Sequence, residues 1–460
     1  MAMNEKMEAQ HMELTKKSSS NPSWLDKLFH LTERKTDVKT EILAGITTFV
    51  TMSYIIFVNP TILSDAGIPK EAAIAATIFA TVFATLLFAL WANMPIAVAP
   101  GMGLNAFFTY TVVLGEGLTW QTGLGAVFIS GVVFFILTIT GLRKKIIEGI
   151  PTILKSAISV GIGLFIAFIG FKQAGIIVSN KENLVTLGQL TKAGPFLALL
   201  GFIAVTALTA RKIKGAALIS ILLVSLAGMV LGIVEAPKSI SSVVSFSMPS
   251  MSETFLQMDI KSALHYGLFS IIFSFTLVEL FGNLGSMIGL SKKAGLMDKK
   301  GEIKGLDKTL MADSLATIAS AAMGSGSTAM NAYVENAVGI AEGGKTGLKA
   351  LIVAILFLVS ILFTPLISII PSFATAPILI MVGALMLTEI KNIPLDEITD
   401  AVPAFCTIIL MPLTFSIGEG LALGFLSYTF VKLLAGRAKE IHWIMYIISA
   451  AFIINFVWAA

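Results

Sequence analysis

The chain has 460 residues, of which 56% are hydrophobic and only 13% are charged, and its mean hydropathy is strongly positive. This balance excludes a soluble domain and indicates an all-α polytopic membrane protein, because apolar runs of membrane-spanning length recur along nearly the whole chain. The net charge of +4 needs no nucleic acid to explain it, since the basic residues gather in short loops beside the apolar runs.

A polar N-terminal region precedes the first apolar run. Residues 1–36 are rich in Ser, Met, Glu and Lys and lack the apolar core of a cleavable signal peptide. Residues 24–40 have the composition of an amphipathic helix that lies on the membrane surface. We therefore interpret residues 1–40 as a cytoplasmic tail followed by a surface segment.

Fourteen candidate membrane spans follow, and they form two sets of seven. The first set occupies the region 41–235 and the second the region 262–436, with an extracytoplasmic loop predicted at 236–261 and a last apolar segment at 437–460 that predicts an interfacial or tucked-back helix over 441–458. The predicted spans are 42–63, 71–93, 95–113, 121–141, 152–171, 195–210, 215–234, 262–290, 308–324, 326–341, 346–370, 373–390, 401–416 and 418–435.

The distribution of Lys and Arg predicts the orientation. The loops after even-numbered spans are basic, as in "GLRKK" at 141–145 and "RKIKG" at 211–215, whereas the loops after odd-numbered spans are not. Basic loops face the cytoplasm. We therefore expect a cell-membrane protein whose N-terminus is cytoplasmic.

An odd number of spans in each half makes the second half enter the membrane from the opposite side, which predicts an inverted repeat. The third span of each half is interrupted, by "MPIAVAPGMGLN" at 94–105 and by "MGSGSTAMN" at 323–331. Such Pro-, Gly- and Ser-rich segments break a helix, and unpaired backbone is tolerated at membrane depth only around a cavity or inside protein. The short echo between "GLNAFF" at 103–108 and "AMNAYV" at 329–334 sets Asn105 against Asn331. We expect broken half-helices that meet at a substrate site.

Two carboxylates lie inside the predicted spans. Glu335 follows the second interruption, four residues after Asn331, so we expect both side chains on one face of a half-helix. Glu279 lies in span 8, with Asn283 one turn later on the same face. A charged group at mid-membrane costs about 2.5–3.5 kcal/mol, which favours a functional role. The alternatives are that Glu335 pairs with a Lys or caps a helix and that Glu279 is a structural acid.

One sequence motif fits a nucleotide-binding pattern by its letters but not by its context. "GIAEGGKT" at 339–346 fits the phosphate-loop pattern, but it lies between two apolar spans with no preceding strand, so we interpret it as a basic cytoplasmic turn. The one cysteine, Cys406, and four scattered histidines offer no disulfide, metal site or nucleophile. We expect neither a cofactor nor an enzyme.

Four blocks of the sequence resemble the AzgA-like purine permeases, a branch of the nucleobase–cation symporters that is related to the nucleobase-ascorbate transporters. The blocks are "AGITTFVTMSYIIFVNPTIL" at 44–63, "ANMPIAVAPGMGLNAFFTYTVV" at 92–113, "AYVENAVGIAEGGKTGL" at 332–348 and "MPLTFSIGEGLALGF" at 411–425. The resemblance implies a 14-span inverted-repeat fold with a core of spans 1–4 and 8–11 and a gate of spans 5–7 and 12–14. It also implies import of guanine, hypoxanthine or adenine with protons, and by analogy a homodimer.

The expected chemistry suits a flat purine. A carboxylate accepts two parallel hydrogen bonds from the N–H edge of guanine, amide groups serve the remaining polar atoms, and aromatic rings cover the faces. The candidate substrate ligands are Glu335, Asn331, Asn283, Glu279, Asn105, Phe107, Phe108 and Tyr333, and the candidate proton carriers are Glu279 and Glu335.

The sequence departs from the family pattern in two places. In span 8 the family pattern usually reads Phe-Asp-x-x-Gly, and this chain has Phe281-Gly282-Asn283-Leu284-Gly285, without the acid. The stretch "GSGSTAMNAYVEN" at 324–336 also differs from the Gly-Thr-Ser-Thr-Val-Thr run that usually precedes Tyr-x-Glu, although Glu335 matches the family's acid. Three hypotheses follow: a proton-coupled purine permease, a transporter of anions or other solutes with the same fold, and a binding-only or inactive homologue.

Overall fold

The computed structural model of the protein describes residues 23–265, 269–298, 303, 305–326 and 330–459. Within these ranges, eight helices are long and apolar enough to cross a membrane: Val38–Asp65, Lys70–Trp91, Trp120–Ile139, Thr152–Gln173, Ala193–Ala210, Gly347–Ile369, Ser372–Asn392 and Ile417–Leu434. Shorter apolar helices at Met102–Val113, Ala216–Val230, Ile271–Leu280 and Ile398–Leu413 occupy four more of the predicted spans. Residues 1–22 of the predicted tail lie outside the described residues.

The surface segment at 24–40 is not one continuous helix as the sequence predicted. Helix α2 (Trp24–Phe29) ends at His30, which adopts the left-handed conformation, and α3 begins only at Val38. The Asp26 carboxylate accepts hydrogen bonds from both the amide and the hydroxyl of Thr32, and this contact turns the chain back. Asp37 then caps α3 through the amide of Thr40.

The first repeat consists of helices, the short strand β1 and a hairpin of two further strands, β2 and β3. They are α3 (Val38–Met52), α4 (Ile55–Asp65), α5 (Lys70–Leu86) with its π-helical extension η2 (Leu87–Trp91), β1 (Val98–Pro100), α6 (Met102–Ala106) with the π-helical η3 (Phe107–Val113), α7 (Trp120–Ile139), α8 (Leu142–Gly149), α9 (Thr152–Gln173), β2 (Ile177–Asn180), β3 (Leu184–Leu187), α10 (Ala193–Ala210) and α11 (Ala216–Val230). The predicted first span is therefore two helices, separated at Ser53 and Tyr54.

The second repeat follows a linking segment that contains the 3₁₀ turn η4 (Ile240–Ser242). Its elements are α12 (Ile260–His265), α13 (Phe269–Gly282), α14 (Leu284–Lys293), α15 (Leu306–Met323), β4 (Met330–Ala332), α16 (Asn336–Ala341), α17 (Gly347–Ser360), η5 (Ile361–Phe363), α18 (Thr364–Ile369), α19 (Ser372–Met386), η6 (Leu387–Asn392), α20 (Ile398–Leu413), α21 (Ile417–Leu434), η7 (Ala438–Glu440) and α22 (Trp443–Ala459). Span 8, predicted as one run over 262–290, is interrupted at Asn283. The predicted C-terminal helix is α22, which packs against α21 and α13.

The two interrupted third spans meet each other. Strand β1 pairs antiparallel with β4, so that Val98 lies opposite Ala332 and Ala99 opposite Asn331. The pairing satisfies backbone groups that neither segment can satisfy alone at membrane depth. Each strand leads into a short half-helix, α6 after β1 and α16 after β4. The predicted broken half-helices are thus present in both repeats.

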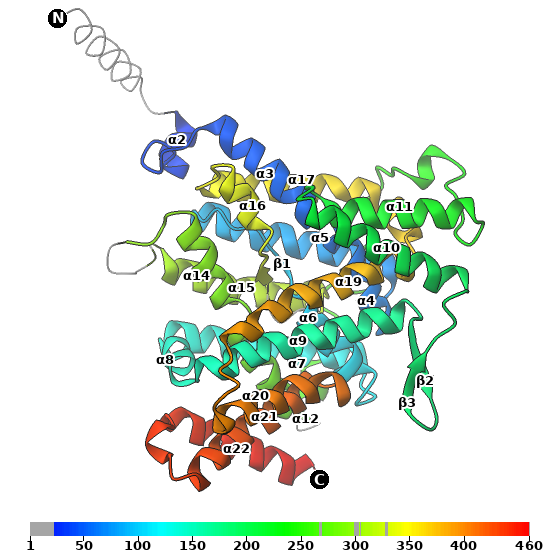
Figure 1. Cartoon of the computed structure of the whole chain (residues 1–460). Coiled ribbons are helices and arrows are strands. Elements are labelled where there is room, and N and C mark those ends of the chain that lie inside the picture. Colours follow the sequence, from blue (N-terminus) through cyan, green and yellow to red (C-terminus); the bar gives the residue numbers. More distant parts are fainter. Residues whose placement is uncertain (1–22, 266–268, 299–302, 304, 327–329, 460) are drawn as a thin grey trace, which may run out of the picture.

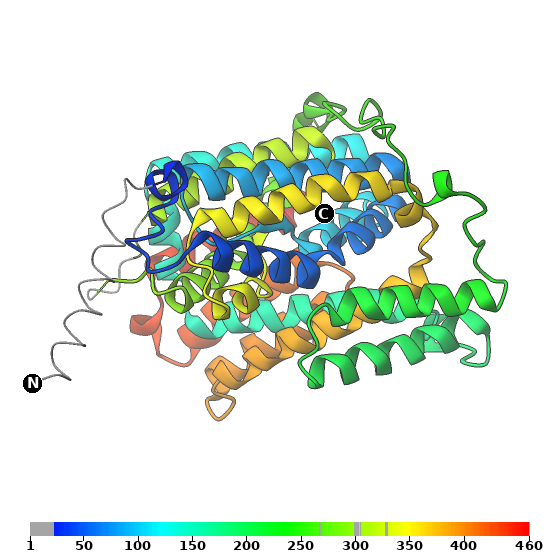
Figure 2. The same cartoon turned by 90° about the horizontal axis from the view of Figure 1, so that it is seen from above.

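The helices form two groups (Figures 1 and 2). Helices α9, α10, α11, α19, α20 and α21 pack mainly on one another, whereas α3, α5, α7, α15, α16 and α17 form the other group together with the paired strands. In the first group α9 and α19 cross closely because Gly383 lies against the Gly163 carbonyl, where a Cβ atom would clash with backbone. The groups correspond to the gate and the core that the resemblance implied.

The ends of the molecule differ in character. The α2 segment, α8, the end of α14 and the start of α15 lie at one end in Figure 1, and the β2–β3 hairpin lies at the other. The basic loops at 141–145 and 211–215 belong to the α2 end, as do Lys292 at the end of α14 and Lys308 at the start of α15, as the alternation of spans predicts. Below, these two ends are called the basic end and the hairpin end.

Candidate functional site

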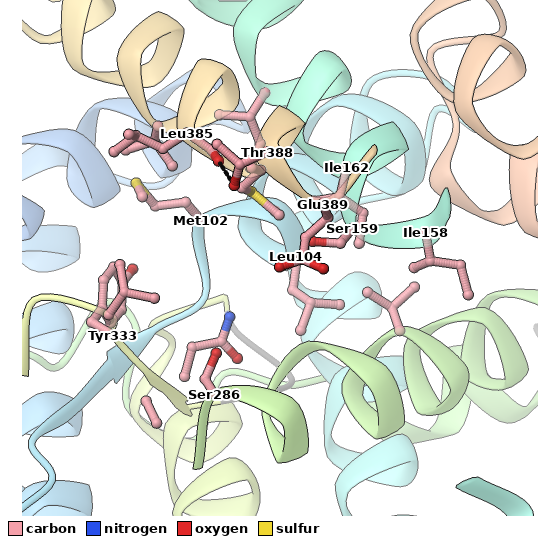
Figure 3. A pocket seen from close by; sticks show the side chains of 18 of the residues that line it. Met102, Leu104, Ile158, Ser159, Ile162, Ser286, Tyr333, Leu385, Thr388 and Glu389 are labelled. Atoms are coloured by element: carbon pink, nitrogen blue, oxygen red, sulfur yellow. Dashed lines mark hydrogen bonds between the residues drawn. The ribbon is translucent and has the colours of Figure 1, made fainter. Parts of the chain in front are cut away.

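A cavity of about 320 Å³ lies between the paired strands and the gate helices. Its core side is lined by residues of α6, β4 and the start of α16, and its gate side by residues of α9, α19 and η6 (Figure 3). Its mouth is on the basic end, because Lys155 lies in the first turn of α9 and Glu389 lies in η6, which follows α19. A cavity of this size falls at the low end of the roughly 300–1,000 Å³ of small-molecule sites.

Glu335 is the carboxylate at the centre of this cavity. It is the residue directly before α16, and its Oε1 atom accepts a hydrogen bond of 2.8 Å from the Tyr54 hydroxyl. Its Oε2 atom is buried and has no hydrogen-bond partner in the described part of the chain. A buried carboxylate oxygen without a partner favours a ligand that brings an N–H donor or a proton. Glu335 does precede a half-helix, but its side chain faces the cavity and does not cap α16.

Asn331 and Tyr333 reach the cavity from strand β4 and the residue after it. The Asn331 side chain lies against Gly101, where a Cβ atom would come within 2.7 Å of its Nδ2 atom, and its Oδ1 atom is buried without a partner among the described residues. Tyr333 donates its hydroxyl proton to the Pro100 carbonyl at 2.6 Å, which locks its ring beside β1. Asn331 therefore lies on a strand. The predicted arrangement, with Asn331 and Glu335 on one face of a half-helix, is not present.

Asn283 does not line the cavity. It is fully buried, and its amide group donates to Asp313 Oδ1 at 2.6 Å and to the Met330 carbonyl at 3.1 Å, while its Oδ1 atom accepts from the Ala332 amide at 2.8 Å. Two of these bonds are to strand β4, and the third, to Asp313, is to the neighbouring helix α15. The expected amide ligand is instead the residue that fixes the strand bearing Asn331.

Glu279 lies behind the cavity, on the face of α13 directed at α15. It is fully buried, accepts a hydrogen bond of 2.7 Å from the Thr317 hydroxyl, and has a second oxygen without a described partner. One turn along α15, Asp313 pairs at 2.9 Å with the buried guanidinium of Arg143. Glu279 thus belongs to a buried ionic cluster and is absent from the cavity lining, because α13 turns Val278 toward the cavity instead.

The remaining predicted ligands belong to the core. Asn105 is fully buried in α6 and hydrogen-bonds Asn59, so it does not occupy a place equivalent to Asn331 in its strand. Phe107 packs edge-on against Phe275, with ring centroids 4.8 Å apart, and Phe108 is also fully buried. Neither ring lines the cavity. Apolar residues just after a broken segment are therefore core here, not ring-stacking ligands.

The cavity lining also contains residues that were not predicted from the sequence: Tyr54 and the gate-side residues Ser159, Thr388 and Glu389. Tyr54 lies at the break in the first span, and its ring meets that of Tyr333 edge-on with centroids 6.4 Å apart. A tyrosine within a block that already resembled a known family was an available signal. No signal in the sequence distinguishes the gate-side residues, because they become neighbours of the site only when the two groups of helices pack.

Gly282 is the last residue of α13, directly before Asn283. Because Asn283 contacts strand β4, the backbone of Gly282 lies at the interruption of span 8 beside that strand. The position that carries an acid in the resembling family is therefore next to the candidate site.

The turn that fits the phosphate-loop pattern is filled by the protein's own carboxylate. The Oε1 atom of Glu41 accepts from the Lys345 amide at 2.8 Å, and its Oε2 atom accepts from the amides of Thr346 and Lys349 at 3.4 and 3.1 Å. These N–H groups at the start of α17 are the ones an anion would use. Glu41 is fully buried, so it closes this position to a phosphate.

At the hairpin end, side chains join the core to the gate. Tyr110 at the end of the first half-helix donates to Asp65, and Gln173 at the end of α9 donates to Tyr110 at 2.8 Å and to Asp65 at 3.1 Å. Phe415, between α20 and α21, packs edge-on against Tyr110, and its carbonyl accepts from the Thr111 hydroxyl at 2.7 Å. We call Asp65, Tyr110, Gln173 and Phe415 the outer contact. The cavity is therefore open toward the basic end and closed toward the hairpin end.

Comparison with known proteins identifies the family. The sequence profile of the permease family matches residues 39–453. The chain is 49% identical to a protein of Methanocaldococcus jannaschii named as a permease, over 95% of this chain and 98% of that one. It is 41% identical to the adenine permease AdeQ of Escherichia coli, over 95% and 97% of the two chains, and 44% identical to the guanine/hypoxanthine permease PbuO of Bacillus subtilis, over 93% and 99%.

Among solved structures, the fold is similar to the transmembrane domain of the cyanobacterial bicarbonate transporter BicA. The TM-score is 0.63 at 18% sequence identity, over 84% of this chain and 97% of that one. This likeness concerns the fold and agrees with the inverted-repeat architecture. On the strength of the profile and of these relatives, the chain is a member of the permease family and an integral membrane protein.

Proposed function

We propose that the protein imports purine nucleobases across the cell membrane by proton symport and alternating access. The observation that carries the proposal is the pair of unpartnered acceptors in the cavity, Glu335 Oε2 and Asn331 Oδ1. Both accept N–H donors, and a purine presents such donors along one edge of a flat ring. The names of the relatives support adenine, guanine and hypoxanthine as the substrates to test first.

The rest of the cavity suits a planar, uncharged ring. The first amides of a helix have no partner inside the helix, so the start of α6, at Gly103 and Leu104, offers N–H groups to the acceptor atoms of the ring. Tyr54 and Tyr333 supply aromatic surface, and Ile162 and Met386 supply an apolar wall from the gate. A purine in this place is held by core and gate together.

The proton has two candidate carriers. Glu335 has a free oxygen in the cavity, and Glu279 has a free oxygen in the buried cluster behind it. Protonation of Glu335 changes what the cavity can bind, whereas protonation of Glu279 removes a negative charge beside Asp313. We propose Glu335 as the principal substrate ligand and Glu279 as the proton carrier.

Alternating access requires the outer contact to open and the mouth at the basic end to close. The orientation of the basic loops supports a cytoplasmic basic end and a cytoplasmic N-terminus. We propose that this arrangement corresponds to an inward-facing state. A homodimer, implied by analogy alone, stays a prediction.

An anion transporter of the same fold is the runner-up. The carboxylates of Glu335 and Glu389 in the cavity lining disfavour an anion, and likeness to BicA concerns the fold alone. Binding-only behaviour is the third candidate, because Gly282 replaces the acid that the resemblance implies.

Uptake of radiolabelled adenine, guanine and hypoxanthine into cells without their own purine permeases tests the proposal. We expect saturable uptake that a protonophore abolishes. Absence of uptake in the wild type and in Gly282→Asp would refute purine transport, and uptake that needs sodium but survives the protonophore would refute proton coupling.

A further inference from the structure

A lysine is buried beside the candidate site, and its ammonium group donates to neutral oxygens of the two interrupted spans. The Lys349 side chain is fully buried in α17, and its Nζ atom donates to the Pro95 carbonyl at 2.9 Å and to the carbonyl and the side-chain Oδ1 of Asn336, both at 3.1 Å. All three of these acceptors are neutral oxygens, and the acid that interacts electrostatically with the ammonium group is Glu41. Burial of an ion costs several kcal/mol, so a buried lysine whose ammonium group donates to neutral oxygens requires a reason.

The oxygens around Lys349 belong to the two interrupted spans. Pro95 lies before strand β1, and Asn336 is the first residue of α16, adjacent to Glu335. Asn336 also donates to the Ala97 carbonyl at 2.7 Å and accepts from the Ala97 amide at 2.8 Å. The ammonium group therefore joins the segment before β1 to the start of the half-helix that positions Glu335.

The protein holds the lysine in this place from both ends. Its backbone amide is bound by the Glu41 carboxylate, together with the amides of Lys345 and Thr346. Its side chain runs over Gly339 and Gly344, where added Cβ atoms would lie 2.8 Å from Lys349 Cε and Cδ. Two glycines of the phosphate-loop pattern thus leave the space that the Lys349 side chain occupies.

We propose that Lys349 is a tethered cation that positions the start of α16, and with it the Glu335 carboxylate, for substrate binding. Three neutral oxygens at about 3 Å form the surroundings that an ammonium ion or a monovalent cation prefers. Covalent attachment keeps this cation in place through the transport cycle. The proposal rests on the function proposed above only for its effect on the substrate.

The first test asks whether the site is a cation site and needs no substrate. Lys349→Ala removes the atoms of a propylammonium ion, so we expect a lower thermal midpoint that added propylammonium raises in the variant but not in the wild type. 1-Propanol, which has the same chain without charge, is the control. Equal rescue by propanol, or no rescue by propylammonium, would overturn the cation assignment.

The second test asks whether the cation acts on the substrate site. Lys349→Met keeps the apolar stem and removes the charge, and we expect it to weaken purine binding at least about tenfold, equivalent to one lost charged hydrogen bond. Lys308→Met, an exposed lysine at the basic end, is the matched control and should bind like the wild type. Wild-type affinity in Lys349→Met would refute the positioning role.

The two tests separate the inference from the proposed function. If the wild type binds no adenine, guanine or hypoxanthine, the purine proposal fails, and the propylammonium response of Lys349→Ala still decides whether the cation site exists. If the wild type binds purines and Lys349→Ala shows no specific response to propylammonium, the function stands and the inference fails.

Discussion

Replacement of Glu335 by Gln is the sharpest test of the candidate site. The substitution keeps the size of the side chain and one acceptor oxygen, but it exchanges the unpartnered Oε2 atom for an NH₂ group or turns that group toward Tyr54. A purine N–H that met a carboxylate oxygen then meets at best a neutral acceptor.

The magnitude follows from the hydrogen bonds at stake. A hydrogen bond to a charged group contributes about 1.5–3 kcal/mol, which corresponds to roughly 10- to 150-fold in the dissociation constant. Tyr54→Phe removes only the partner of Oε1 and leaves both oxygens free, so we expect a smaller loss, about 2- to 10-fold, from weaker orientation of the carboxylate.

The assay is equilibrium binding of radiolabelled purine to the purified protein in detergent, with the thermal midpoint measured on the same samples. Glu182→Gln is the matched control, since this acid is exposed in the turn between β2 and β3 and is absent from the cavity lining. Purine affinity in Glu335→Gln equal to that of the wild type and of Glu182→Gln would show that Glu335 is not a ligand.

Four further predictions concern polar side chains around the site, at the outer contact and at the start of α3. Asn283→Ala leaves the Ala332 amide and the Met330 carbonyl without their side-chain partner, each at about 1–3 kcal/mol, so both the thermal midpoint and purine affinity should fall. Asn331→Ala should lower purine affinity without lowering the thermal midpoint, because the Asn331 Oδ1 atom has no described partner within the protein. A fall in thermal midpoint equal to that of Asn283→Ala would contradict the assignment of Asn331 as a ligand. Gln173→Ala removes two hydrogen bonds of the outer contact. In a Leu104→Cys, Cys406→Ala background, the introduced thiol should therefore react faster with an impermeant reagent applied from outside. An unchanged reaction rate would argue against a gate at the outer contact. The Thr40 amide and hydroxyl hold the pKa of Asp37 below its ordinary value of 3.8, so its contribution to stability is present above pH 3.8 and is lost as the pH falls through the lowered pKa. Asp37→Ala should therefore lower the thermal midpoint at pH 7, with the gap closing in acid, and a gap that stays constant with pH would rule out the cap.

The sequence by itself determined the membrane class, the positions of the spans and the inverted repeat. Apolar runs of fixed length and the side preference of Lys and Arg are local properties, so they can be read without the fold. The interruptions at 94–105 and 323–331 were also readable, because Pro and Gly break helices wherever they stand. Glu335 followed from the same reasoning, since a carboxylate beside a broken segment at membrane depth has few neutral explanations.

Only the tertiary structure decided which polar groups face the cavity. Glu279 lies on α13 and Asn283 lies at the interruption between α13 and α14, so they do not share one helix face as predicted. Both side chains are directed at α15, where Asn283 bonds Asp313 and Glu279 bonds Thr317. The pairing of β1 with β4 moved Asn331 from a helix to a strand. Helical periodicity gives the direction of one side chain relative to another on the same helix. The packing of the other helices determines which of these side chains faces the cavity.

The same limit explains the lysine and the phosphate-loop pattern. From sequence, "GIAEGGKT" was a basic turn, and nothing local indicated that Glu41, some 300 residues earlier, fills its amides or that Lys349 reaches Asn336. Contacts between residues so far apart in the chain depend on how the two repeats interlock. The apolar composition determined that the protein lies in a membrane. The pairing of its two interrupted spans determined the positions of Glu335 and Lys349, because it brings the two repeats together at these residues.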